Sequence, residues 1–519
     1  MSRRTPRTQA RSQFHSYWGT FSFSMVTPSP TTFLGRTLSI GGMSLPNAPN
    51  WAGGDASPLE AGDNAFVFDS LGAIGSIYTS WICLSPGTIG GFNAVWDRVA
   101  PLTVGGIRDA HVIVVAHQNS IAPQYNLTTG DVNSDTRLRI NPQVQGEAVD
   151  YVDSGNGAQL TLALAAAQAM LLTNAGRVDV RMRPCALRID GSAPVIRTIT
   201  VPENVRLIGA GSGLSRIVGW ATGDQTVFNV QGTLSGWTVT SPVPEAATSG
   251  SSQGVVVLQN VTAVIPLIED IVLLLGVGTS FARTQRVGIQ VLGDSFGGAQ
   301  VRNCFVRQVA TPTSAISHFT TFGTELIGVQ VRGLTADLGA SVSDVRAECC
   351  DVVLDIFGAN EVRSYNIQGT SIFRFGYRVQ NSFSPADLRG ASLSVASFIF
   401  HAVRAVATTA AIRIGFSQDG QLIGPSLTSV RARWPSAVST TRIFIDAQTG
   451  TQGRSIRGLQ AVNCIIDPSN SAFAATTAVN LDASGGGSIR GGITTSDIGN
   501  ATTPLVSLGS VTWVQTNLL

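Results

Sequence analysis

Lysine is absent from this chain, and charge of either sign is scarce. Arginine supplies all 34 basic residues, Asp and Glu together number 32, and charged residues make up only 13% of the 519 residues. The formal net charge of +2 argues against nucleic acid as the main partner. Since 43% of the residues are apolar, we expect an ordered protein with a weakly charged surface.

The sequence also lacks cysteine motifs and long apolar segments. Its six cysteines, at positions 83, 185, 304, 349, 350 and 464, form no CxxC pair and no metal-site spacing. We therefore expect buried, reduced thiols, assembly in a reducing cytoplasm, and neither a metal nor another cofactor. The most apolar segment, 264–277, carries Glu269 and Asp270 in its middle, so no membrane insertion is expected. No export signal is expected, because no apolar segment follows Arg3 and Arg4.

Fifty-six glycines and little helical periodicity indicate an all-β chain with one clear helix. Apolar residues recur at helical spacing from Leu160 to Leu171, which predicts a helix over 157–173. Ser154 or Asn156 can cap its start, and Gly176 lies where a C-terminal cap belongs. From residue 177 the period changes to two, which predicts a half-buried strand.

A phrase with regular glycines follows this strand. Residues 201–211 read V-P-x-N-V-x-L-x-G-x-G, and a phosphate-binding loop is one interpretation of the glycines. The phosphate-binding fingerprint G-x-G-x-x-G would need its third glycine at position 214, where this chain has Leu214, and no helix signal follows. We therefore do not favour that loop. The order of helix, strand and phrase resembles the start of right-handed parallel β-helices of the pectate-lyase-like superfamily, as found in bacteriophage tail spikes. The resemblance implies a right-handed parallel β-helix over 154–519, with the helix capping its open end.

An internal repeat supports a solenoid. A phrase of apolar, variable, bend, apolar, variable and apolar residues starts at Leu234, Ile268, Val301, Leu326, Val342, Val362, Leu388, Leu427, Ile456 and Ile489. Its third position is Gly, Asn, Asp or Ser, which suits a bend with positive φ. Ten coils at roughly 4.8 Å each would make a rod of about 50 Å.

The second position of the phrase is arginine in five copies. If the register holds, one outer edge carries Arg302, Arg363, Arg389, Arg457 and Arg490. These five are the candidate carbohydrate-binding residues, because guanidinium groups offer planar forks to acidic glycans. The alternative is that their stems merely cover neighbouring apolar surface.

No catalytic residues can be assigned from the sequence. Acidic residues are densest at Asp344, Glu348, Asp351, Asp355 and Glu361, which either pair across coils on one face or lie in solvated turns. His111 and His117 share a predicted strand face, but no third metal ligand accompanies them. The phrases typical of pectate lyases are absent, and no Ser-His-Asp order is suggested.

Two further regions precede the solenoid. Residues 1–60 are rich in Pro, Ser, Thr and Gly with scattered aromatics, which predicts an extended arm that docks on a partner. Within 61–153, a β-rich module and connector, the pattern G-D, then W-I-C at 81–83, then P-G-T at 86–88 resembles a small module of phage tail fibres and spikes. Ile89 departs from that pattern, which usually has tryptophan there.

The resemblances imply a phage virion protein, a homotrimeric tail spike or fibre that binds host surface polysaccharide. The arm would attach it to other virion proteins after assembly in the host cytoplasm, and no nucleic acid partner is expected. Two alternatives stay open, a depolymerase spike that hydrolyses or eliminates glycan linkages, and a head decoration or capsid fibre without enzymatic activity.

Overall fold

The structure is a computed structural model, and it divides the chain into two compact units, Met1–Val152 and Asp153–Leu519. Side chains are described over residues 112–117, 150–171, 177–189, 198–219, 226–240, 254–258, 265–276, 285–293, 298–307, 325–333, 339–381, 387–401, 408–416, 419–435, 441–450, 453–467 and 475–516. Some further strand residues have a described backbone only. The finer division into 1–60, 61–153 and 154–519 stays a prediction.

The first unit contains a four-stranded sheet in the order β1-β4-β5-β6, formed by β1 (Ser16–Phe21), β4 (Asn64–Asp69), β5 (Ile77–Ser85) and β6 (Val95–Val99). Strand β1, from the predicted arm, pairs in parallel with β4, whereas β4, β5 and β6 pair antiparallel. Two small hairpins join β2 (Ser39–Ile40) to β3 (Met43–Ser44) and β7 (Leu102–Thr103) to β8 (Gly106–Ile107). The predicted small β-rich module is therefore present, and part of the arm belongs to its sheet.

The predicted histidine strand is β9 (Val112–His117). Its four central residues are all buried, so its two faces do not alternate between core and solvent. His111 and the side chains of Trp81 and Cys83 lie outside the described residues.

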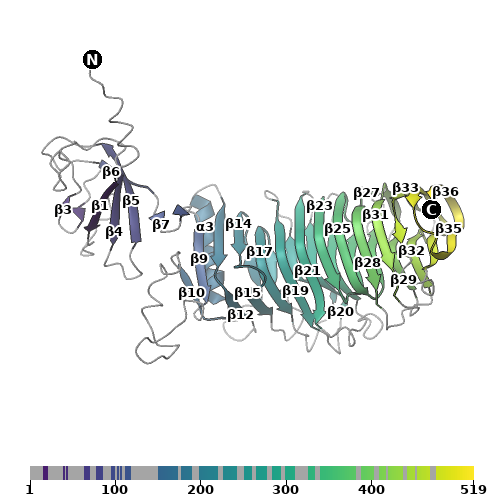
Figure 1. Ribbon diagram of the computed structural model, residues 1–519, viewed down its shortest axis with the longest axis horizontal. Coiled ribbons are helices and arrows are strands. Elements are labelled where there is room, and N and C mark those ends of the chain that lie inside the picture. Colours follow the sequence, from purple (N-terminus) through teal and green to yellow (C-terminus); the bar gives the residue numbers. More distant parts are fainter. Residues whose placement is uncertain are drawn as a thin grey trace, which may run out of the picture. The chain divides into compact units, whose positions relative to one another are not determined.

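The second unit is built from strands that stack along one axis, from α3 (Ala158–Thr173) to β36 (Figure 1). Its strands are β10 (Tyr151–Asp153), β11 (Val178–Met182), β12 (Cys185–Ile189), β13 (Ile199–Val201), β14 (Val205–Ile208), β15 (Ser215–Gly219), β16 (Phe228–Val230), β17 (Thr233–Ser241), β18 (Gly250–Gln259), β19 (Leu267–Gly276), β20 (Arg283–Gly293), β21 (Ala299–Val309), β22 (Glu325–Gly333), β23 (Ala340–Glu348), β24 (Val352–Phe357), β25 (Val362–Ile372), β26 (Phe375–Asn381), β27 (Asp387–Arg389), β28 (Ser392–Phe400), β29 (Thr408–Phe416), β30 (Gly420–Ile423), β31 (Ser426–Arg433), β32 (Thr441–Gln448), β33 (Arg454–Val462), β34 (Ile465–Ile466), β35 (Ala475–Ser496) and β36 (Ala501–Leu518).

These strands pair in parallel with the strand one coil away. In the first coils three strands make a turn, since β11, β12 and β13 pair with β14, β15 and β16. Later coils use longer strands, so β17, β19, β21, β23, β25 and β28 follow one another on one side. The predicted all-β fold, a parallel β-helix with a capping helix, is therefore confirmed.

The core consists of columns of apolar side chains inside the coils. One column runs in register through Leu207, Leu234, Ile268, Val301 and Val342, all with no exposed surface. Each coil thus covers the apolar face of its neighbour, which is why the phrase repeats. The thiols whose placement is described, Cys185, Cys304, Cys349, Cys350 and Cys464, are free and buried, as predicted.

Helix α3 begins and ends where the sequence predicts, and it packs on β11, β13 and β14 of the first coils. Its buried residues include Leu160, Leu164 and Ala167. Asn156 accepts a hydrogen bond from the Ala158 amide at 3.0 Å. The main cap is Asp153, which is fully buried and accepts hydrogen bonds from the amides of Gly155, Gly157, Gln159 and Leu160 at 2.8–3.0 Å. Within the described residues, no helix is long and apolar enough to span a membrane.

The phrase at 201–211 owes its residue types to backbone geometry. Asn204 has a φ of 60°, which asparagine tolerates better than most residues. A Cβ on Gly209 would lie 2.2 Å from the Gly236 carbonyl oxygen, so only glycine fits between these coils.

Candidate functional site

The five candidate arginines occupy three columns, so the predicted single edge is wrong. Arg302 aligns with Glu269 and Ser343, just before a bend. Arg363 aligns with Ser341, two positions earlier on its strand. The physical reason is that similar bend phrases occur at more than one corner of the coil, which the sequence pattern does not distinguish.

The third column contains Arg389, Arg457 and Arg490, with Ile423 between the first two. Arg457 and Arg490 are direct neighbours across two coils, and both are exposed. Arg302 donates to Glu269 at 2.7 Å, and Arg389 lies 3.9 Å from Asp387. Carbohydrate binding by these five residues stays a prediction.

The five acidic residues, for which the sequence left open pairing on one face or a place in solvated turns, are also separated. Asp351 and Asp355 are fully buried, whereas Glu361 is exposed at a different corner. Glu348 lies near the guanidinium groups of Arg307 and Arg346, at 3.6 Å and 2.5 Å. The five carboxylates therefore do not share one face, and Asp351 and Asp355 do not lie in solvated turns either.

Asp355 belongs to a buried polar ladder on another side of the coil. Gln290 donates to Gln330, Gln330 donates to Asp355, and Arg378 joins Asp355 to Glu325, all at 2.7–2.9 Å. Burial lowers the pKa of the Arg378 guanidinium, but the two carboxylates outweigh burial and raise that pKa above its ordinary value. Because its charged groups pair with one another, the ladder supports the fold and is not a candidate active site.

A row of bend residues marks the best candidate site. Seven successive coils place one residue each at a φ between 50° and 55°: Asp270, Asn303, Asp344, Asn366, Val395, Ser429 and Asn463. Most are Asn, Asp or Ser, whose short polar side chains favour this conformation more than larger ones do. We call these seven residues the bend row. Val395 is the exception, because a β-branched residue is strained at positive φ.

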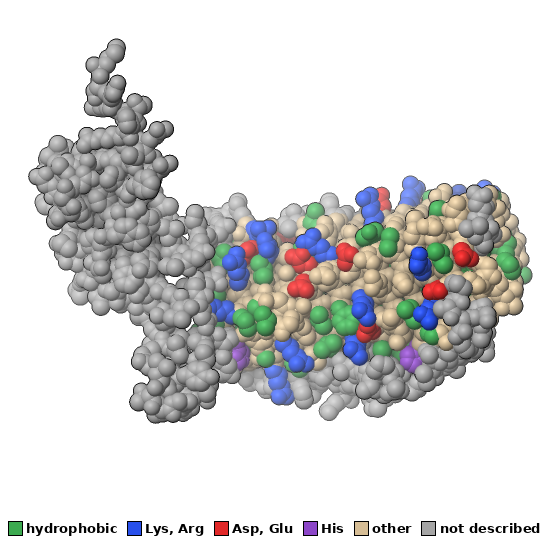
Figure 2. Space-filling view, viewed as in Figure 1, with side chains coloured by type: hydrophobic (Ala, Val, Ile, Leu, Met, Phe, Trp, Pro, Cys, Tyr) green, Lys and Arg blue, Asp and Glu red, His purple; other side chains and the backbone are tan. Residues whose placement is uncertain are grey.

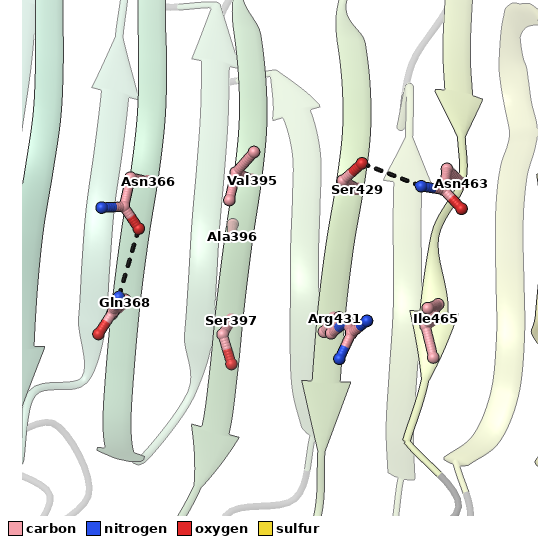
Figure 3. Close-up of a pocket in the computed structure, with 9 residues that line it drawn as sticks. All are labelled: Asn366, Gln368, Val395, Ala396, Ser397, Ser429, Arg431, Asn463 and Ile465. Atoms are coloured by element: carbon pink, nitrogen blue, oxygen red, sulfur yellow. Dashed lines mark hydrogen bonds between the residues drawn. The ribbon is translucent and has the colours of Figure 1, made fainter.

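Two positions after each bend, a second outward row runs parallel to the first. Its members align in register and are Val272, Phe305, Arg346, Gln368, Ser397, Arg431 and Ile465. We call these seven residues the second row. Figure 3 shows the two rows side by side on consecutive coils, with the bend residues above and Gln368, Ser397, Arg431 and Ile465 below.

Three depressions between the rows merge into one groove. Their volumes are about 360, 370 and 330 Å³, and neighbouring depressions share lining residues. The first two share Asn303, Asp344 and Arg346, and the last two share Asn366 and Gln368. We call this continuous depression the axial groove. The wider surface is mainly uncharged, and Figure 2 shows charged side chains only as scattered spots on the face in view.

Hydrogen bonds hold the groove's side chains in defined orientations. Gln368 donates to Asn366 at 3.3 Å, and Asn366 donates to Asp344 at 2.8 Å. Asn463 donates to Ser429 at 3.1 Å (Figure 3). These ordered amides leave other donor and acceptor positions facing the groove.

The groove also contains aromatic and apolar surface. The Arg346 guanidinium lies 5.7 Å from the centre of the Phe305 ring, a cation–π distance. Val395 is 44% exposed in the middle of the groove, and Tyr365 is 54% exposed in the row on the other side of the bends. Cys304 also lines the wall, but burial raises the pKa of its thiol to about 12, so it is not a nucleophile at neutral pH.

The groove can bind a polar chain, and one part of it carries the acidic groups that catalysis needs. Asp270 and Asp344 both line the first depression, with Asn303 on the coil between them. Among the residues whose side chains are described, no group of three or more His, Cys, Asp or Glu could hold a metal ion. Arg302 is the one predicted arginine whose row borders the bend row.

Sequence reasoning identified several bend residues but not the groove. Asp270, Asn303 and Asp344 stand at the third position of the repeat phrase, where we predicted positive φ. Arg431 and Gln368 carried no sequence signal, because the second row becomes visible only when the coils are in register.

No protein-family model matches the sequence, and a search of curated proteins finds no match. Among solved structures, the chain is similar to the catalytic unit of a GH87 α-1,3-glucanase from Streptomyces thermodiastaticus, with 13% identity, 86% of this chain and 79% of that chain covered, and a TM-score of 0.33. The A-module of a mannuronan C-5 epimerase from Azotobacter vinelandii gives 13% identity, 69% and 95% coverage, and a TM-score of 0.26. PfbA, a surface adhesin of Streptococcus pneumoniae, has 12% identity with this chain, coverage of 70% of this chain and 89% of PfbA, and a TM-score of 0.29. At such scores the similarity carries no argument about activity or ligand.

Proposed function

We propose that the chain is a bacteriophage tail spike or tail fibre that binds a host surface polysaccharide in the axial groove. The supporting observation is the groove's extent over seven coils, from Asp270 to Asn463. Six steps of about 4.8 Å give a length of about 29 Å, which suits several units of an extended polymer. A small ligand would instead favour an enclosed pocket.

The groove's chemistry fits a sugar chain. Amide and hydroxyl groups such as those of Gln368, Asn463 and Ser397 can exchange hydrogen bonds with sugar hydroxyls. Apolar surface at the half-buried Phe305 and the exposed Val395 can pack against the C–H faces of pyranose rings. A glycan chain presents both polar hydroxyl groups and apolar ring faces, so a groove with polar and apolar side chains side by side can bind it.

The virion assignment rests on the sequence resemblances at 62–95 and 157–213. A homotrimer is part of the proposal, because a weakly charged rod gains by covering its long flanks. The arm attaches the trimer to other virion proteins. Mass measurement of the purified protein tests the trimer, and antibody labelling of particles distinguishes a tail location from a head decoration.

Blocking the groove tests glycan binding. Ser397 is exposed on β28 in the second row, so Ser397→Trp would fill the groove without entering the core. We expect binding to polysaccharide extracted from host cells to weaken at least about tenfold, equal to about 1.4 kcal/mol. The matched control is Ser341→Trp, on an exposed position of β23 outside the groove lining. Equal binding by both variants and the original chain would contradict the proposal.

A depolymerase is the second candidate, and it is favoured by Asp270 and Asp344. Two coil steps separate their backbones by about 9.6 Å, and inverting glycosidases hold their two carboxyl groups roughly 6.5–9.5 Å apart. Asp344 accepts from Asn366, and Asp270 accepts from Ser212 at 3.3 Å. Release of reducing ends from host polysaccharide, abolished in Asp344→Asn with binding retained, would establish the enzyme. Binding without any release would leave an adhesive spike.

A further inference from the structure

The third depression of the axial groove contains one charged side chain, that of Arg431. Its other lining residues are Asn366, Gln368, Val395, Ala396, Ser397, Ser429, Asn463 and Ile465. Arg431 is exposed and, among the residues that the structure describes, forms no ion pair. In register it lies between Ser397 and Ile465, so neither neighbour on the adjacent coils neutralises it.

The rest of the groove has a different electrostatic character. The first depression contains the carboxylates of Asp270 and Asp344, and its one cation, Arg346, contacts Glu348 at 2.5 Å. Asn366 and Gln368 separate this acidic part from the Arg431 part, and their hydrogen bonds run towards Asp344. The groove therefore changes from acidic to basic along its length.

We propose that the third depression is a subsite for a carboxylate-bearing sugar residue, with the Arg431 guanidinium pairing with the sugar carboxylate. The proposal rests on the proposed function, because it assumes a glycan in the groove. It adds the substrate class, an acidic polysaccharide, and the place where its charge is recognised.

The geometry of the depression favours a sugar carboxylate over a free anion. The guanidinium presents a planar fork of donors that matches a carboxylate and holds it in a fixed orientation. Ser397 aligns with Arg431 on the adjacent coil, Ser429 lies two residues before Arg431 on the same strand, and both offer hydroxyl groups (Figure 3). Val395 and Ala396 form an apolar surface one coil away, where a pyranose ring can rest. A free inorganic anion would gain nothing from contact with that apolar surface.

Paired glycans provide the test. Oligosaccharides of galacturonate, mannuronate and sialic acid are compared with their own methyl esters, which keep the backbone and remove the charge. Binding of the full-length protein is measured by calorimetry at low salt and at 0.5 M salt. We expect at least one acidic form to bind about 10- to 100-fold more tightly than its ester, and the difference to shrink at high salt.

Variants identify the residue responsible. Arg431→Gln should remove the preference, so that the acid and its ester bind alike, while Arg431→Lys should retain part of the preference. Arg433→Gln is the matched control, because Arg433 is exposed on the same strand but does not line the depression. It should keep the full preference.

The outcomes separate this inference from the proposed function. If neither these glycans nor polysaccharide from host cells binds, both the proposed function and the subsite are wrong; if only the host polysaccharide binds, the subsite alone is wrong. If the esters bind as tightly as the acids, or Arg431→Gln keeps the preference, glycan binding stands and the subsite is wrong. Loss of the preference in Arg433→Gln as well would assign it to overall charge and overturn the role of Arg431.

Discussion

Arg378→Met should destabilise the β-helix more than single substitutions of exposed residues do. Arg378 is 5% exposed and donates three hydrogen bonds of 2.7–2.8 Å, one to Asp355 and two to Glu325. Charge-assisted hydrogen bonds contribute about 1.5–3 kcal/mol each, which gives a gross loss of about 4.5–9 kcal/mol. In the variant, Arg374 still contacts Glu325 at 2.7 Å and Gln330 still donates to Asp355, so the two carboxylates keep part of their stabilisation and the net loss is smaller.

We therefore expect a net loss of about 3–5 kcal/mol, the range for breaking a buried ion pair on one side. The assay is urea unfolding followed by tryptophan fluorescence at pH 7.

The double variant Asp355→Asn, Arg378→Met is the control, because it removes the carboxylate left without its cation and keeps the Glu325–Arg374 pair. It should recover much of the lost stability, since the cost of the single variant comes from unpaired buried charge. The reasoning is refuted if the single variant unfolds like the original chain, or if the control variant is no more stable than the single variant.

Three further predictions concern the backbone and the thiols. Val395→Asn should raise the free energy of unfolding by about 1 kcal/mol in the same urea assay, because asparagine tolerates the φ of 54° that strains valine; a loss would contradict the strain. Asp153→Ala should lower the free energy of unfolding by about 2 kcal/mol and increase proteolysis within α3, whereas Asn156→Ala should cost less than about 1 kcal/mol; equal effects would refute the assignment of the main cap. Because burial raises the pKa of the Cys185 and Cys304 thiols to about 12, only about 1 in 10,000 is thiolate at pH 8, so mass spectrometry should find their peptides unmodified by iodoacetamide until urea is added; rapid native labelling would contradict their burial.

Local patterns in the sequence were sufficient to predict the fold. The switch from helical spacing to a period of two predicted α3 and β11, because both depend on neighbours in sequence. Bend residues were predicted where residue type decides φ, as at Asn303 and Asp344. Val395 could not be found this way, because valine does not favour positive φ and only the packed coils hold it there.

The location of the candidate site depends on the register between coils, which local sequence patterns do not determine. The phrase at Val362 suggested a bend at Ser364, whereas the structure bends at Asn366, so Arg363 moved out of its expected column. Loops of different lengths between coils hide which residues become neighbours. Arg431 therefore aligns with Ser397, which lies 34 residues earlier in the chain, and no spacing in the sequence predicts this pairing.

A crystal structure of the full-length protein with an oligosaccharide from the host polysaccharide tests the central claim most directly. The account predicts sugar density along the axial groove between the bend row and the second row, with consecutive units across consecutive coils from Asp270 to Asn463. Density elsewhere, such as along the Arg457 and Arg490 column, with an empty groove would contradict it.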